Sequence, residues 1–161
     1  ALNWLPRTPG EQISFYVARG DFKRVSMFGS AAIPALAAVL RGGSGERRVA
    51  AANTLAELGE SSVVKLLLSA LRDSEAAVRA AAVNGLARMG DPQAVTGLLP
   101  LLKDRDRNVR VATVSALGQM ADTGAIRPLT ELVEDREREV RAALAEALGL
   151  ELPTPLRAVM R

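Results

Sequence analysis

The amino-acid sequence predicts an all-α solenoid built from two-helix units that repeat every 31 residues. Residue types recur at this fixed interval, and a fixed period of this length is typical of stacked repeats. Within each interval, apolar residues follow helical spacing. The composition agrees, because 48% of residues are apolar but only 3% are aromatic. Leucine and alanine favour helices, whereas a sheet would need more aromatic and β-branched residues.

The repeat is visible as four series of residues that keep the same spacing. Each series places one residue type, or a substitute for it, at the same slot in four successive segments. The series are Arg48, Arg79, Arg110 and Arg141; Leu55, Leu86, Leu117 and Leu148; Leu40, Leu71, Leu102 and Val133; and Gly42, Asp73, Asp104 and Asp135. Four series with one spacing indicate a repeated structural unit.

Each unit contains two helical patterns, which are clearest in the second unit. The first helix is predicted at 61–71, where apolar residues form a single stripe, and a polar turn follows at 72–74. The second helix is predicted at 76–89, with an inward face made of Val78, Ala82, Leu86 and Met89. Gly90 and Pro92 come directly after it and are typical of a helix end.

The second helices are rich in alanine and also carry glycine, as the stretch 78–90 shows. Small side chains allow neighbouring helix axes to approach closely, and alanine has the best helix propensity of all residues. One helix pair cannot bury its apolar face alone, but a stack of pairs can. We therefore expect the small residues to serve packing between units.

The whole chain, 1–161, is expected to form one solenoid domain with four repeats at 31–150. The segment 1–30 fits the period poorly and holds all the aromatic residues, so it is predicted to be an atypical N-terminal cap. The segment 151–161 is expected to be a C-terminal tail or a short capping helix.

The cap is expected to contain one helix at 11–19 and another at 22–28, with Asp21 as the N-cap of the second. In the third unit, Gly97 and Pro100 fall inside the first helix. Proline removes a backbone hydrogen bond there, so this helix should be kinked or short. Pro34 and Pro128 lie near helix starts, where proline is tolerated.

The residue types present exclude several kinds of chemistry. The chain has no cysteine and no histidine, so it lacks thiols, the commonest general base and the commonest metal ligand. The glycine-rich segment 41–48 lacks the Gly-Lys-Ser/Thr of a phosphate-binding loop, and its register makes it a turn between two helices. The sequence therefore predicts no enzyme, with no catalytic residue, no cofactor and no metal.

The expected surroundings follow from what the chain lacks. No run of about 18 apolar residues is present that would span a membrane. No secretion signal is visible, so a cytoplasmic protein is expected. The net charge is only +3, from 21 basic and 18 acidic residues, which disfavours nucleic acid as a partner.

The pattern Val-Arg-x-Ala-x-x-x-x-Leu, following a turn with aspartate, resembles the HEAT-like repeat family over about 31–150. The short, alanine-rich form is also found in phycobilin lyase subunits. The resemblance implies a right-handed superhelix and a structural ladder, in which aspartate and arginine are paired as Asp73, Asp104 and Asp135 with Arg79, Arg110 and Arg141. Because Gly42 occupies the aspartate slot of the first unit, Arg48 is expected to lack its partner.

In this family the second helix of each unit lines the concave side of the superhelix. Three residues of each second helix lie opposite the apolar stripe in this chain. They vary from unit to unit and include few long charged side chains, unlike the ladder residues. The predicted protein-binding strip consists of Val49, Asn53, Glu57, Ala80, Asn84, Arg88, Val111, Ser115, Gln119, Ala142, Glu146 and Leu150.

These features favour a non-catalytic scaffold that binds a protein or peptide along the strip. One alternative, implied by the resemblance alone, is a phycobilin lyase-like subunit or another accessory component of an enzyme. The other is a HEAT-like nucleic-acid-binding protein. Such proteins place basic and aromatic residues on the concave side, whereas this strip holds Arg88 against Glu57 and Glu146, with no aromatic residue.

Overall fold

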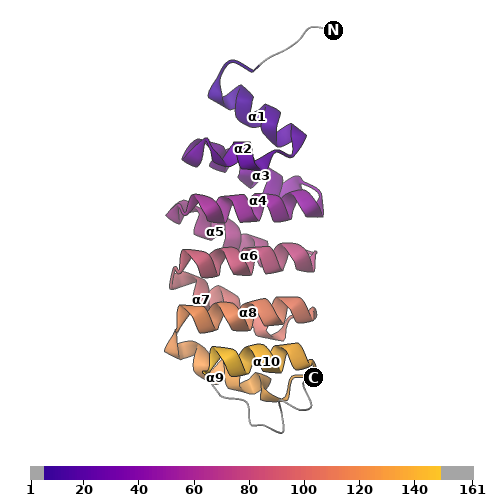
Figure 1. Cartoon of the computed structure of the whole chain (residues 1–161), viewed down its shortest axis with the longest axis vertical. Coiled ribbons are helices and arrows are strands. Elements are labelled where there is room, and N and C mark those ends of the chain that lie inside the picture. The colour runs from indigo at the N-terminus through magenta and orange to yellow at the C-terminus, as the bar shows by residue number, and fades with distance from the viewer. Residues whose placement is uncertain (1–5, 150–161) are drawn as a thin grey trace.

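Two rows of helices run down a single stack in the computed structural model, which describes residues 6–149. The front row in Figure 1 contains the second helices of the four units: α4 (Gly45–Leu58), α6 (Ala76–Met89), α8 (Arg107–Met120) and α10 (Arg138–Ala147). Their first residues are spaced 31 apart along the chain. The described residues include no strand, so the all-α prediction is confirmed, while the hand of the superhelix stays a prediction.

The back row contains the first helices and is less regular. It consists of α3 (Ile33–Gly42), α5 (Ser61–Ala70), α7 (Gln93–Leu98) with the 3-10 turn η2 (Leu99–Lys103), and α9 (Ile126–Thr130) between the 3-10 turns η3 (Thr123–Ala125) and η4 (Glu131–Glu134). Ahead of both rows lie α1 (Pro9–Arg19), α2 (Phe22–Ser26) and the 3-10 turn η1 (Gly29–Ala32).

Proline and threonine explain the two short first helices. Pro100 has no backbone N–H, so the α-helical hydrogen bonds of α7 stop at Leu98 and a 3-10 turn continues the chain, as the sequence predicts. In the fourth unit, Pro128 likewise lacks an N–H, and the hydroxyl of Thr130 donates to the carbonyl of Arg127 at 2.8 Å. This bond lies where α9 ends after five residues.

The core is one continuous cluster of buried side chains that extends from the cap to the fourth unit. Each second helix packs against the next, α4 on α6, α6 on α8, and α8 on α10. Small residues make this approach possible. A Cβ atom built on Gly85 would lie 2.9 Å from the Cβ of Ala56 and 3.1 Å from Cδ1 of Leu67, so no larger residue fits there without displacing a neighbour.

The N-terminal cap follows the predicted pattern of two helices. Thr8 and Glu11 form a capping box at the start of α1, and the carboxylate of Asp21 accepts from the amide of Arg24 at 3.2 Å at the start of α2. Tyr16 packs edge-on against Phe15 and lies beside Phe28, so ring contacts build this end of the stack. Segment 151–161, predicted as a tail or cap, lies outside the described residues.

Helix ends also follow the predicted chemistry. Gly90 ends α6 in the left-handed conformation at φ 63°, where glycine carries no steric cost. Ala121 occupies the same place after α8 at φ 51°, although alanine is strained in this region.

Candidate functional site

Arginine and aspartate side chains join successive units on the flank of the second helices. The guanidinium of Arg79 on α6 donates to both carboxylate oxygens of Asp104 in the next unit, from Nε at 2.8 Å and from Nη2 at 2.7 Å. The same two-bond geometry joins Arg48 to Asp73 and Arg110 to Asp135. Arg79 and Arg110 are only 6% and 5% exposed, so these are nearly buried ion pairs.

Each of these arginines also ties together the turn of its own unit. Nη1 of Arg110 donates to the carbonyl of Asp104 at 2.8 Å, and Nη1 of Arg79 donates to the carbonyl of Asp73 at 2.9 Å. The aspartates in turn accept from the amide two residues further along, as Asp104 does from Asp106 at 2.8 Å. Buried charges of this kind are tolerated because each of the three guanidinium nitrogens donates at least one hydrogen bond and both carboxylate oxygens accept.

The expected pairing within the ladder is wrong by one unit. The carboxylates pair with the arginine of the preceding unit, so Arg48 has a partner in Asp73 and does not need one at Gly42. One period before Arg48, the sequence has Val17 in place of an arginine. A carboxylate at position 42 would therefore have no arginine to bind, which explains why glycine suffices there. Arg141 is the member of the series with no carboxylate among the described residues, since Asp135 bonds to Arg110.

Because of the aspartates of the ladder, the stability of the fold should decrease at acidic pH. Burial raises the pKa of Asp104, but the hydrogen bonds from Arg79 and the amide of Asp106, with the charge of Arg79, outweigh it and lower the pKa below its usual value. The same causes lower the pKa of Asp73 and Asp135. A carboxyl group with a lower pKa when folded adds stability above its unfolded pKa, about 3.9, and loses it as the pH falls through the folded value.

We therefore expect the free energy of unfolding, measured with urea from pH 7 to pH 2, to hold near neutrality and to fall steeply once the pH drops below about 4. In Asp104→Asn, the slope of the free energy of unfolding against pH should correspond to about one proton fewer, because one titrating group is missing. A free energy of unfolding that stays constant across this range would contradict the geometry of the ladder.

The outward side of the second helices, called here the second-helix face, carries two adjoining hollows. The first has a volume of about 330 Å³ and is lined by Asn53, Asn84, Ala87, Arg88, Ser115, Ala116 and Gln119. The second has a volume of about 270 Å³ and is lined by Ser115, Gly118, Gln119, Ala143, Glu146 and Ala147. Because both include Ser115 and Gln119, they form one continuous depression across α4, α6, α8 and α10.

Half of the predicted strip lines this depression: Asn53, Asn84, Arg88, Ser115, Gln119 and Glu146. Val49, Ala80 and Val111 instead pack partly buried against the core, and Ala142 is half-buried. Glu57 is exposed outside both hollows, and Leu150 lies outside the described residues.

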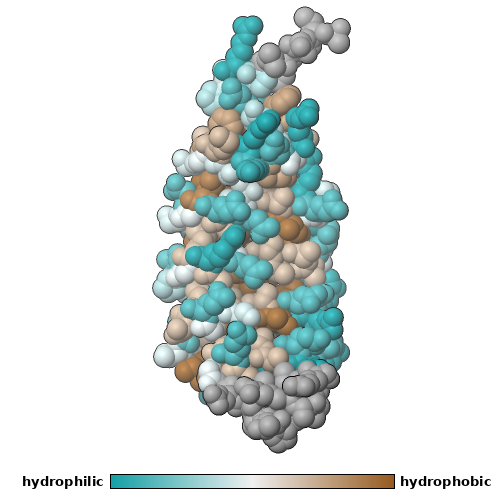
Figure 2. Space-filling view, viewed as in Figure 1, coloured by the Kyte–Doolittle hydropathy of each residue, from teal (hydrophilic) through white to brown (hydrophobic). Residues whose placement is uncertain are grey.

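Sequence reasoning missed the small residues that form the walls of the depression. Ala87, Ala116, Gly118, Ala143 and Ala147 lie beside the polar side chains, one turn or less away along the same helices. Their small size is visible in the sequence, but there it predicts only close packing between units. Figure 2 shows the result, with hydrophilic side chains set among small, weakly apolar ones over this face.

The polar side chains of the depression are free to bind. Within residues 6–149, the side chains of Asn53, Asn84, Ser115 and Gln119 make no hydrogen bond to another residue. Arg88 reaches across to the carbonyl of Asn53 at 3.4 Å, a weak contact. The depression thus offers amide and hydroxyl groups, which both donate and accept, with one positive and one negative charge at its margins.

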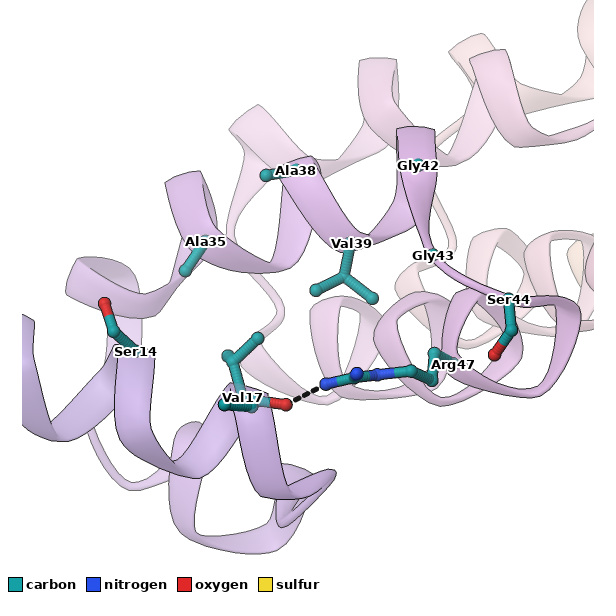
Figure 3. A pocket seen from close by; sticks show the side chains of 10 residues that line it. Ser14, Val17, Ala35, Ala38, Val39, Gly42, Gly43, Ser44 and Arg47 are labelled. Carbon is teal, nitrogen blue, oxygen red and sulfur yellow. Dashed lines mark hydrogen bonds between the residues drawn. The ribbon is translucent and has the colours of Figure 1, made fainter.

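A third hollow, of about 730 Å³, lies between α1 and α3 (Figure 3). Arg47 crosses its floor and donates to the carbonyl of Val17 at the end of α1. Its other walls combine small residues such as Ser14, Ala35 and Gly43 with the side chains of Val17 and Val39. Within the segment 41–48, only residues 43–44 form the turn between α3 and α4, and the rest belongs to these two helices, so the predicted turn is in place but shorter than expected.

The described residues contain no group of three acidic, histidine or cysteine side chains that converge as metal ligands. None of their helices has the length and apolar character needed to cross a bilayer.

Comparison with known proteins identifies the repeats. A family model described as HEAT repeats matches residues 33–107 and 95–156. Among solved structures, a chain in the complex of CpcE and CpcF of phycocyanin lyase from Nostoc sp. PCC7120 is similar, with a TM-score of 0.70 and 26% identity. The alignment covers 92% of this chain and 66% of that one, and no curated protein matches. The chain therefore belongs to the HEAT-repeat family.

Proposed function

We propose that this chain is a non-catalytic scaffold, which binds a protein or peptide in the depression of the second-helix face. The observation that carries the proposal is a contrast between two sets of polar residues. The ladder arginines and aspartates satisfy one another between units. The amides and hydroxyl of the depression remain unbonded to the described protein, and they are aligned over successive helices.

The chemistry of the depression suits a polypeptide. A main chain presents alternating N–H and C=O groups, and a side-chain amide can serve both at once. The alanines beside these amides let a ligand backbone or helix come close. The face of successive repeats is also the surface that repeat proteins use for extended partners.

The same face is poorly suited to nucleic acid. Phosphate binding needs several cations, and stacking needs aromatic rings. Among the residues that line the two hollows, Arg88 is the one cation and Glu146 the one anion, and no aromatic residue lines either hollow. A neutral partner surface matches this charge distribution better than a polyanion does.

The test is to place a long cation in the middle of the depression. Asn84→Arg and Ser115→Arg are expected to weaken binding of a partner, isolated from the source cells with the wild-type chain, by at least tenfold, or about 1.4 kcal/mol. Both side chains point away from the core, so the melting temperature should stay within about 2 °C.

Thr96→Arg is the matched control, because Thr96 is exposed on α7 in the other row of helices. It should leave the partner's affinity unchanged, as measured by calorimetry on purified proteins. Binding that survives both substitutions in the depression would place the partner on another surface.

A second function is favoured by the structural similarity to the phycocyanin lyase complex. In that case the chain would serve as an accessory subunit that acts together with a second protein on a bilin. The two interpretations predict different absorbance spectra when the chain is mixed with a free bilin. A scaffold leaves the visible absorbance of a free bilin unchanged on mixing, whereas a bilin-handling subunit shifts it.

A further inference from the structure

Position 47 is the place where the first unit departs from the other three. One, two and three periods later the chain has Val78, Val109 and Val140, and each of these valines is completely buried. The first unit instead has Arg47, whose side chain is half-buried. A cation thus occupies a slot that the rest of the stack fills with hydrocarbon, and a charge in such a place is costly unless it is paired.

The guanidinium of Arg47 is poorly satisfied where it lies. Nη2 donates to the carbonyl of Val17, and a cation is favourable at this end of α1. Nε, however, is buried without a partner, and no carboxylate of residues 6–149 pairs with this arginine. By contrast, the guanidinium of Arg79 makes four hydrogen bonds. A buried N–H without an acceptor lowers stability, so the contact with α1 does not by itself account for Arg47.

The hollow beside Arg47 opens a second slot that is buried elsewhere. Val39 on α3 is half-buried at its wall. The residues in the same slot of the later units are all buried: Ala70, Leu101 and Leu132. Figure 3 shows Val39 above the side chain of Arg47 and Val17 beyond its tip, so apolar surface borders the cation. The volume of about 730 Å³ falls within the range of pockets that hold small ligands.

No anion balances Arg47 in this hollow. Among the described residues that line it, Arg47 is the one with a charge. The hydroxyls of Ser14 and Ser44 also line it and make no hydrogen bond to another described residue. Residues 1–5 contain no acidic side chain that could serve. A single cation between apolar walls suits a ligand with one negative charge and an apolar part, and the fork of a guanidinium matches a carboxylate.

We propose that the hollow binds a carboxylate carried on a small branched hydrocarbon group. The carboxylate pairs with the guanidinium of Arg47, and the hydrocarbon covers Val17 and Val39. Nε is closed off from solvent in its present position, so the side chain moves into the hollow on binding and Nε gains the acceptor that it lacks. The carbonyl of Val17 keeps the amide of Gly20 as a donor at 3.0 Å.

A free organic acid and the C-terminal leucine of a polypeptide present this same chemistry. The site lies between α1 and α3, away from the depression of the second-helix face, and it does not depend on the function proposed above.

The test follows the Nε–H signal of Arg47 in proton–nitrogen correlation spectra of the full chain, assigned by its loss in Arg47→Lys. The probes are isocaproate as the free acid, N-acetyl-leucine as the end of a polypeptide, isocaproamide as the neutral analogue, and inorganic phosphate as a plain anion. We expect both acids to shift the signal to saturation, and the tighter one identifies the source. No shift with either acid, or an equal shift with the amide or with phosphate, would overturn the proposal.

Two substitutions separate a binding site from a structural arginine. Arg47→Val introduces the residue of the later units, so it should weaken the binding of the tighter acid at least tenfold without lowering the free energy of unfolding. Ala35→Leu keeps Arg47 but fills the hollow with the residue type that Leu66 supplies one period later, and it should weaken binding as strongly. Arg41→Leu, which changes an exposed arginine of α3 outside the hollow, should change the affinity less than twofold.

Calorimetry measures the affinities, and urea denaturation measures the stabilities. If Arg47→Val unfolds more easily and still binds the acid like the wild type, Arg47 only holds α1 in place and the proposal is wrong. Equal losses of affinity in Arg41→Leu and Arg47→Val would place the acid elsewhere. Trp4→Ala should change the affinity less than twofold, and binding that appears only in this variant would mean that the chain itself fills the hollow.

Discussion

Asp104→Ala is expected to lower the free energy of unfolding by about 3–5 kcal/mol, because it leaves the guanidinium of Arg79 buried without its carboxylate. Arg79 is 6% exposed and bonds to both oxygens of Asp104. The loss also removes the bond from the amide of Asp106, which holds the turn in front of α8. Urea denaturation at pH 7, followed by circular dichroism, measures the change.

The matched control is Lys103→Ala, one residue away. Lys103 pairs with Glu131 at 3.3 Å, but the two side chains are 79% and 56% exposed. Exposed pairs contribute about 0–1 kcal/mol, so this variant should unfold close to the wild type. Arg79→Met combined with Asp104→Leu should recover part of the loss, since no unpaired charge remains buried. If Asp104→Ala costs no more than Lys103→Ala, the ladder does not hold the units together.

The second large effect is expected at Gly118, where α8 meets α10. A Cβ atom on Gly118 would lie 2.6 Å from the Cβ of Ala147 and 3.0 Å from its Cα. The Cα of Ala147 belongs to the backbone of the neighbouring helix and cannot turn away. We expect Gly118→Ala to lower the free energy of unfolding by about 1–3 kcal/mol through overpacking, and Gly118→Val to lower it further, both measured by urea denaturation.

Gly42→Ala separates this steric effect from the general preference for alanine in helices. Gly42 ends α3, and a Cβ atom there would meet nothing within 4 Å. Alanine should therefore raise the free energy of unfolding by about 0.4–1 kcal/mol, because it restricts the unfolded chain. A stabilising Gly118→Ala would mean that α8 and α10 can separate without loss.

The Arg–Asp ladder shows where prediction from the sequence reaches its limit. The series predict which residues occupy equivalent positions in successive units. They do not say whether an arginine pairs with the aspartate of its own unit or with that of the next unit, because both pairings fit the same period. Arg79 lies six residues after Asp73 and 25 residues before Asp104, and each of these separations between aspartate and arginine occurs three times in the chain. Only the position of the next unit in space decides that the carboxylate of Asp104, rather than that of Asp73, reaches the guanidinium.

The depression on the second-helix face was predictable in part for a related reason. Helical periodicity put Asn53, Asn84 and Ser115 on one side of their helices, and the structure brings them into one hollow. Periodicity does not say how closely neighbouring helices approach. Periodicity therefore predicts that Val49 and Val111 in the same strip face a partner, whereas they pack partly against the core.

Local chemistry and periodicity were thus enough for the fold class, the helix ends and the short helix at Pro100, because each depends on residues that are close in the sequence. The pairing of charges between units and the shape of the depression depend on contacts between residues about one repeat apart. Such contacts exist only after the units stack, since the distance and rotation between neighbouring helices come from the packing of their small side chains.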